Sequence, residues 1–151
     1  MTAGVPLHVL LAEDNSNDVE MFRVCLERAR ILNDFNVVSD GELALQYARG
    51  EGEYADREKY PRPGLIFLDL NLPKKTGIEV LKAIKDAPET EDIPVVILTI
   101  SQEEDDILQS YQFGSHVYIH KPVDPVNLRE VILGLPGVGL LLASGGPNTY
   151  D

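Results

Sequence analysis

Five short apolar segments alternate with stretches in which apolar residues recur at helical spacing. The apolar segments are 7–12, 35–39, 65–68, 95–98 and 117–119. Each has the length of a buried strand. In the stretch after the first segment, Val19, Phe22 and Leu26 fall on one face of a helix. Strands that alternate with helices are typical of βα units around a parallel sheet with both faces covered, so the pattern predicts an α/β fold.

Capping residues place the helix starts. The predicted starts are Asn15 or Ser16, Asp40-Gly41, Ser101 with Glu104 as a capping box, and Asp124-Pro125. The polar, turn-forming residues 50–64 predict a loop before the third strand. Five strands and five helices in this length suit a flavodoxin-like doubly wound (βα)5 sandwich, with a parallel five-stranded sheet in the order 2-1-3-4-5.

The length and composition fit one folded domain. The chain has 151 residues, of which 44% are apolar and 25% charged, as in ordinary globular proteins. We expect the domain to span residues 1–135. The tail, 136–151, contains the apolar run 138–143 and is expected to pack on the domain, to form a homodimer contact or to be disordered.

The net charge excludes some partners. A formal charge of −12 repels nucleic acid phosphates and anionic membrane surfaces, so no direct contact with either is expected. No apolar run approaches the length of a membrane span, and the start lacks a basic segment that leads into an apolar one. The only cysteine, Cys25, cannot form an internal disulfide and is expected to be buried. These features predict a cytoplasmic protein.

Acidic residues follow two of the predicted strands. Glu13 and Asp14 follow the first strand, and Asp69 follows the third. If these strands are neighbours, the three carboxylates meet at the carboxyl edge of the sheet, where ligands of such folds bind. Crowded carboxylates repel one another unless a cation neutralises them. A hard, oxygen-preferring ion such as Mg²⁺ (or Mn²⁺) is therefore predicted at this edge.

The next two strands add a hydroxyl and an ammonium to the same edge. Thr99 follows the fourth strand, and Lys121 follows the fifth. A metal ion, a hydroxyl and an ammonium together can neutralise the oxygens of a phosphoryl group while a carboxylate attacks it. Asp69 is the candidate nucleophile.

These residues resemble the receiver domain of bacterial response regulators, which is CheY-like. The resemblance rests on Glu13-Asp14, Asp69 with Pro73 and Gly77 behind it, Thr99, and Lys121-Pro122, and it runs from about 7 to 135. It implies that Asp69 is the phosphoacceptor, that Glu13, Asp14, Asp69 and the backbone carbonyl of Asn71 bind the metal, and that Thr99 and Lys121 contact the phosphoryl oxygens. It also implies that Thr99 and Tyr118 switch the surface of helix four and strand five.

The resemblance extends to partners. The stretch 52–77, with its DLNLPKK sequence, and residues 103–111 are most similar to single-domain regulators that act with phytochromes. The implied donor is a sensor histidine kinase of phytochrome type, and the implied output is contact with an unidentified downstream protein. On this interpretation the chain is no enzyme beyond self-phosphorylation from small donors and autodephosphorylation.

Other functions fit less well. A haloacid-dehalogenase-like phosphatase also uses an aspartate nucleophile, but it needs an acid where this chain has Asn71. An unphosphorylated interaction module would not need the carboxylate, threonine and lysine set. FMN binding would meet repulsion from Glu13 and Asp14. The histidines His8, His116 and His120 lack metal-ligand spacing and are expected to be structural or solvated.

One residue departs from the family pattern. Ile100 follows Thr99 at a position that is usually small in receiver domains. A bulky side chain beside an acyl phosphate obstructs the attacking water. Slow autodephosphorylation is therefore predicted.

Overall fold

The computed structural model describes residues 8–31, 34–99 and 117–135. The strands are β1 (Val9–Ala12), β2 (Phe35–Val38), β3 (Leu65–Asp69), β4 (Val95–Thr99) and β5 (Val117–His120). The helices are α1 (Ser16–Arg28), α2 (Gly41–Arg49), the short 3-10 helix η1 (Gly52–Tyr54), α3 (Gly77–Asp86) and α5 (Pro125–Leu133). The helix predicted to begin at Ser101 lies outside the described residues.

The five strands form one parallel sheet in the order β2-β1-β3-β4-β5, which confirms the predicted topology. Ala12 of β1 pairs with Val38 on one side and with Leu68 on the other. Asp69 pairs with Leu98, and Thr99 pairs with His120. The third, fourth and fifth strands therefore run one residue further than their apolar segments, because the backbone of the polar end residue still joins the ladder.

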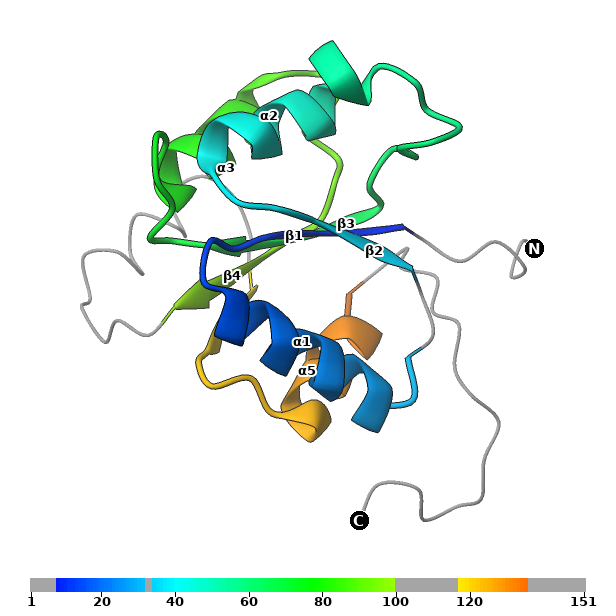
Figure 1. Ribbon diagram of the computed structural model, residues 1–151, viewed down its shortest axis with the longest axis vertical. Coiled ribbons are helices and arrows are strands. Elements are labelled where there is room, and N and C mark those ends of the chain that lie inside the picture. The colour runs from blue at the N-terminus through cyan, green and yellow to red at the C-terminus, as the bar shows by residue number, and fades with distance from the viewer. Residues whose placement is uncertain (1–7, 32–33, 100–116, 136–151) are drawn as a thin grey trace.

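Helices cover both faces of the sheet (Figure 1). Helices α2 and α3 lie on one face, and α1 and α5 lie on the other. Leu10, Ile66 and Leu68 pack under α2 and α3, whereas Leu11 and Phe67 pack against α1 and α5. Because successive side chains point to opposite faces and both faces are buried, the inner strands β1 and β3 are apolar up to the polar residue at the end of β3. The edge strand β2 is less buried and contains Asn36 and the exposed Val37.

Short polar side chains begin the helices where the sequence placed them. Asn15 Oδ1 accepts from the Asp18 backbone N–H at 3.0 Å, and Asp40 Oδ1 accepts from the Leu43 N–H at 2.8 Å. Asp124 caps α5, with Pro125 in its first turn. The start of α3 was missed, although Thr76 and Glu79 form a capping box there.

The predicted loop before β3 packs closely on α2. Tyr54 and Tyr60 contact the fully buried ring of Tyr47. The Arg57 guanidinium donates to the carbonyls of Ala48 and Tyr60, both at 3.1 Å, and so satisfies the open end of α2. Gly50 ends α2 with φ +70°, a conformation that favours glycine.

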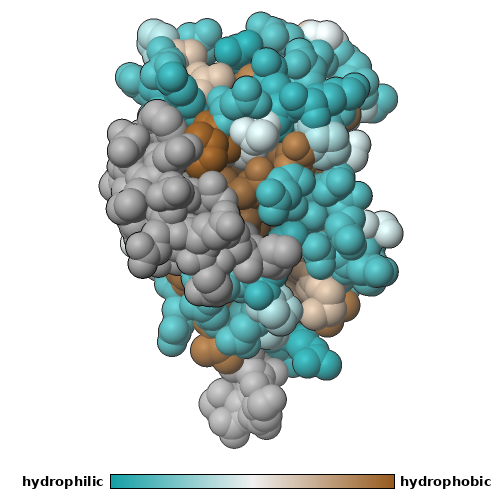
Figure 2. Space-filling model, turned by 90° about the vertical axis from the view of Figure 1, so that its left-hand side faces the viewer, coloured by the Kyte–Doolittle hydropathy of each residue, from teal (hydrophilic) through white to brown (hydrophobic). Residues whose placement is uncertain are grey.

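Among the described residues, no helix is both long and apolar enough to cross a membrane. Figure 2 looks onto the edge at which the strands end. Among the residues coloured in this view, hydrophilic side chains predominate, and a smaller apolar group lies between the upper and lower parts of the molecule.

Candidate functional site

Three carboxylates meet at the carboxyl edge of the sheet, as the sequence predicted. Glu13 and Asp14 follow β1, and Asp69 is the last residue of the neighbouring strand β3. One carboxylate oxygen from each lies within 4.8 Å of the other two. Glu13 and Asp69 are 2% and 5% exposed, whereas Asp14 is exposed to solvent. Two buried acids side by side need a positive charge to balance them.

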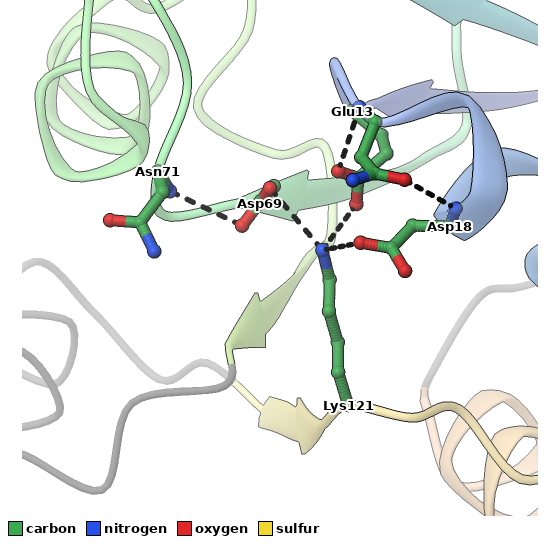
Figure 3. A network of polar contacts seen from close by, with 6 residues as sticks. Glu13, Asp18, Asp69, Asn71 and Lys121 are labelled. Carbon is green, nitrogen blue, oxygen red and sulfur yellow. Dashed lines mark hydrogen bonds and ion pairs between the residues drawn. The ribbon is translucent and has the colours of Figure 1, made fainter.

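Lys121, which directly follows β5, supplies that charge (Figure 3). Its Nζ donates to Glu13 Oε1 at 2.6 Å, to Asp18 Oδ2 at 2.9 Å and to Asp69 Oδ2 at 3.3 Å. The lysine side chain is only 10% exposed. The ammonium has three protons, and each has a carboxylate partner in this arrangement.

The environment shifts the pKa values of two of these groups. Burial raises the pKa of Glu13 to about 7, and the hydrogen bond from Lys121 only partly offsets this because the charge of Asp69 raises it further. Burial by itself lowers the pKa of Lys121, but the hydrogen bonds to Glu13 and Asp18 and the charge of Asp69 outweigh it and raise this pKa. The lysine is therefore charged throughout the physiological pH range.

The donor set fits a divalent cation. Glu13, Asp14 and Asp69 offer carboxylate oxygens, the ligand type that Mg²⁺ and Mn²⁺ take. Lys121 is the one ammonium that contacts these carboxylates among the described residues, and it faces two buried acids, Glu13 and Asp69. Asn71 lies beside the cluster, where its backbone N–H donates to Asp69 Oδ1 at 3.2 Å. A role of its carbonyl as a metal ligand stays a prediction.

Two further residues predicted for the site, Thr99 and Tyr118, lie on strands of the same sheet. Thr99 is the last residue of β4, the strand next to β3, and Tyr118 lies on β5 opposite Ile97. The side chains of Thr99 and Tyr118 lie outside the described part of the structure, as does Ile100. The role of Thr99 as a phosphoryl contact and the roles of Thr99 and Tyr118 in the switch therefore stay predictions. The role of Ile100 in slowing the attack of water also stays a prediction.

The loop behind Asp69 is fixed by close backbone contacts. The Gly77 N–H donates to the Leu70 carbonyl at 3.0 Å, and a Cβ at Gly77 would overlap the Asp69 carbonyl oxygen. The Gly41 N–H donates to the Pro73 carbonyl at 3.1 Å, which ties the loop to the start of α2. Glycine at 77 therefore lets α3 begin directly against the backbone of Asp69.

Comparison with known proteins agrees with this geometry. The family model of the response regulator receiver domain matches residues 9–133. The chain belongs to this family. The response regulator Rcp1 of Synechocystis sp. is 39% identical to this receiver domain over 130 residues, which cover 86% of each protein.

Solved structures are similar over nearly the whole chain. The bacteriophytochrome response regulator RtBRR is 39% identical with a TM-score of 0.81, and the match covers 96% of this chain and 87% of that one. The Mn²⁺-bound form of Rcp1 is 38% identical with a TM-score of 0.73, and the match covers 90% and 99%. The predicted similarity to phytochrome-associated regulators is confirmed.

The receiver domain therefore functions in two-component signalling, in which receiver domains interact with histidine kinases. Proteins of this family are signalling proteins and not conventional enzymes. The phosphatase and the unphosphorylated module are not favoured, because the chain matches the receiver family and is similar to phytochrome response regulators.

Sequence reasoning missed one member of the receiver site. Asp18, which no sequence motif singled out, contacts Lys121 from the first turn of α1. Its place four residues after Asp14 was a usable signal, because the first turn of a helix that follows β1 lies at the edge where the strands end.

The single cysteine was predicted correctly: Cys25 is buried and its thiol contacts the Val123 carbonyl at 3.0 Å.

Proposed function

We propose that Asp69 accepts a phosphoryl group from a sensor histidine kinase. The observation that carries this proposal is the position of the Asp69 carboxylate, held between Glu13, Asp14 and the Lys121 ammonium at the open edge of the sheet. An ordinary solvated acid of a loop would not need a buried carboxylate, Glu13, and a nearly buried ammonium, Lys121, beside it. The arrangement suits a nucleophile that must meet an anionic donor.

The transfer exchanges one bond for another. An Asp69 carboxylate oxygen attacks phosphorus, the phosphorus–nitrogen bond to the kinase histidine breaks, and the electron pair stays on the imidazole, which is released neutral or takes a proton from water. The product is an acyl phosphate on Asp69. Lys121 already lies 3.3 Å from Asp69 Oδ2, so its ammonium can neutralise a phosphoryl oxygen, and Thr99 at the end of β4 would donate a hydroxyl to another.

Glu13, Asp14, Asp69 and the carbonyl of Asn71 would hold Mg²⁺ or Mn²⁺. When bound, the cation offsets the negative charge that carboxylate and phosphoryl oxygens bring together. The relative Rcp1 has been solved in a Mn²⁺-bound form, which supports this assignment. The three carboxylates of this chain supply the hard oxygen ligands.

The phosphorylated domain would signal through its surface. Thr99 would move toward the phosphoryl group and Tyr118 would turn inward, which alters the surface of helix four and strand five that a downstream protein contacts. A phytochrome-type kinase is the proposed donor, because RtBRR and Rcp1 are the similar proteins. We also propose that residues 1–135 form the receiver unit and that 136–151 contribute to packing or to a homodimer.

The experiment is phosphorylation from a small donor. We incubate the protein with acetyl phosphate and Mg²⁺ and measure the intact mass, which should rise by one phosphoryl group. The Asp69→Asn variant should give no adduct, and Asp56→Asn, which removes an exposed acid of the loop before β3, should behave like the parent. An adduct on Asp69→Asn would assign the nucleophile to another residue.

A further inference from the structure

Lys121 is shared among three carboxylates, and one of them stands apart. Glu13 and Asp69 belong to the acidic group that could hold a cation, whereas Asp18 does not belong to it. Asp18 Oδ2 lies 2.9 Å from Lys121 Nζ, closer than the Asp69 oxygen at 3.3 Å. Figure 3 shows the ammonium between Asp69 on one side and Asp18 on the other.

A divalent cation at Glu13 and Asp69 would compete with Lys121 for these carboxylates. The lysine donates to Glu13 Oε1 and Asp69 Oδ2 in this structure, so a cation that took either oxygen would remove one of its acceptors. A lysine side chain that is 10% exposed cannot turn freely to water, and a buried ammonium without partners is costly. Asp18 is the carboxylate that can stay on the ammonium while the other two turn to the cation.

Asp18 is well placed for this task. Its backbone N–H is capped by Asn15 Oδ1 at 3.0 Å, which fixes the residue in the first turn of α1. The partial positive charge of a helix N-terminus attracts an acidic side chain in the first turn. Asp18, Glu13 and Lys121 also line a small pocket of about 20 Å³, room for about one water.

We propose that Asp18 is a positioning residue that keeps Lys121 paired when Glu13 and Asp69 bind the divalent cation. It thereby supports cation binding, and it leaves a lysine proton directed at the incoming phosphoryl oxygen. This inference rests on the metal site of the proposed function. Asp18 would affect the affinity for the cation only indirectly, because it contacts Lys121.

The experiment is a double-mutant cycle on Mg²⁺ affinity, measured by isothermal titration calorimetry without any phosphoryl donor. Asp18→Asn keeps the shape of the side chain and removes its charge, and it should raise the Mg²⁺ dissociation constant about three- to tenfold. In a Lys121→Met background the same substitution should change the dissociation constant less than about twofold, because the ammonium with which Asp18 pairs is absent.

Two controls separate this effect from general electrostatics. Asp18→Glu keeps a carboxylate and should recover most of the affinity. Glu20→Gln removes one charge from the exposed side of α1, where Glu20 pairs with Arg23 at 2.7 Å, and should leave the affinity close to that of the parent. Urea unfolding of each variant verifies that it is folded.

The outcomes distinguish the two proposals. An equal loss of Mg²⁺ affinity with and without Lys121, or no loss in Asp18→Asn, would overturn the role of Asp18 and leave the metal site intact. Failure of the parent protein to bind Mg²⁺ would overturn both. A loss that depends on Lys121 and is recovered by Asp18→Glu supports the inference.

Discussion

Lys121 Nζ lies 2.6 Å from Glu13 Oε1, and this contact joins residues 108 positions apart in the sequence. It links the end of β1 to the end of β5 across the whole width of the site. Both side chains are nearly buried, at 2% and 10% exposure. The pair therefore joins β1 and β5 at the sheet edge, and it engages a carboxylate of the proposed cation site.

Replacement of this lysine should have opposite effects on stability and on metal binding. Without Mg²⁺, Lys121→Met leaves buried carboxylates unpaired and should lower the free energy of unfolding by about 2 kcal/mol. Mg²⁺ should bind the variant more tightly than the parent and restore most of the stability. Urea unfolding with and without Mg²⁺ measures both effects, and a loss that Mg²⁺ does not reduce would contradict this view of the pair.

Removal of the cation should destabilise the parent protein. Mg²⁺ at about one hundred times its dissociation constant should raise the free energy of unfolding by about 2.7 kcal/mol, because the ion binds only the folded chain. EDTA should reverse the gain. Asp14→Asn should abolish most of the gain, whereas Glu27→Gln, which removes an exposed acid of α1, should keep it. Equal gains in the two variants would place the cation elsewhere.

Two glycines should respond very differently to the same substitution. A Cβ at Gly77 would overlap the Asp69 carbonyl oxygen, whereas at Gly134 the nearest atom, the Glu130 carbonyl oxygen, lies 3.5 Å away. We expect Gly77→Ala to cost about 2–4 kcal/mol of stability and to slow phosphorylation, because Asp69 must shift. Gly134→Ala should be nearly neutral. If Gly77→Ala and Gly134→Ala had similar unfolding curves, the loop behind Asp69 would be able to accommodate a Cβ at position 77 at little cost in stability.

The stability should fall in mild acid because of His8. Burial lowers the pKa of the His8 imidazole below its ordinary value of 6.5, and the charge of Asp34 only partly opposes this. The imidazole stacks near Tyr47, whose hydroxyl lies 3.2 Å from Nε2. Below about pH 6.5 the unfolded chain binds a proton that the folded chain does not, so stability drops as the pH falls toward the folded pKa and then levels.

The measurement is the free energy of unfolding against pH for the parent and His8→Gln. The variant should show a smaller slope between about pH 7 and the folded pKa of His8. An NMR titration should place that pKa below 6.5. Parallel slopes would assign the acid sensitivity to other groups.

The lifetime of the acyl phosphate should depend on the residue after Thr99. Ile100 lies outside the described residues, and this prediction rests on the sequence alone. Ile100→Ala should release phosphate faster, because a small side chain gives water access to the phosphoryl group. Phosphate release after removal of the donor measures the rate. A rate no faster than that of the parent would exclude Ile100 as the obstacle.

The sequence determined the order of the elements and the identity of the acids. Strand segments buried on both faces must be apolar throughout, and capping residues such as Asp40 and Asp124 act on N–H groups two or three positions away, so both can be predicted locally. Because parallel strands end at one edge, the topology by itself brought Glu13, Asp14 and Asp69 together.

Only the tertiary structure decided how the charges pair. Asp18 contacts Lys121 across 103 residues, and Arg57 satisfies the end of α2 from a loop that showed no pattern. Such contacts depend on side-chain direction and burial once distant segments pack, which no local spacing encodes. The burial that raises the pKa of Glu13 likewise exists only in the folded protein.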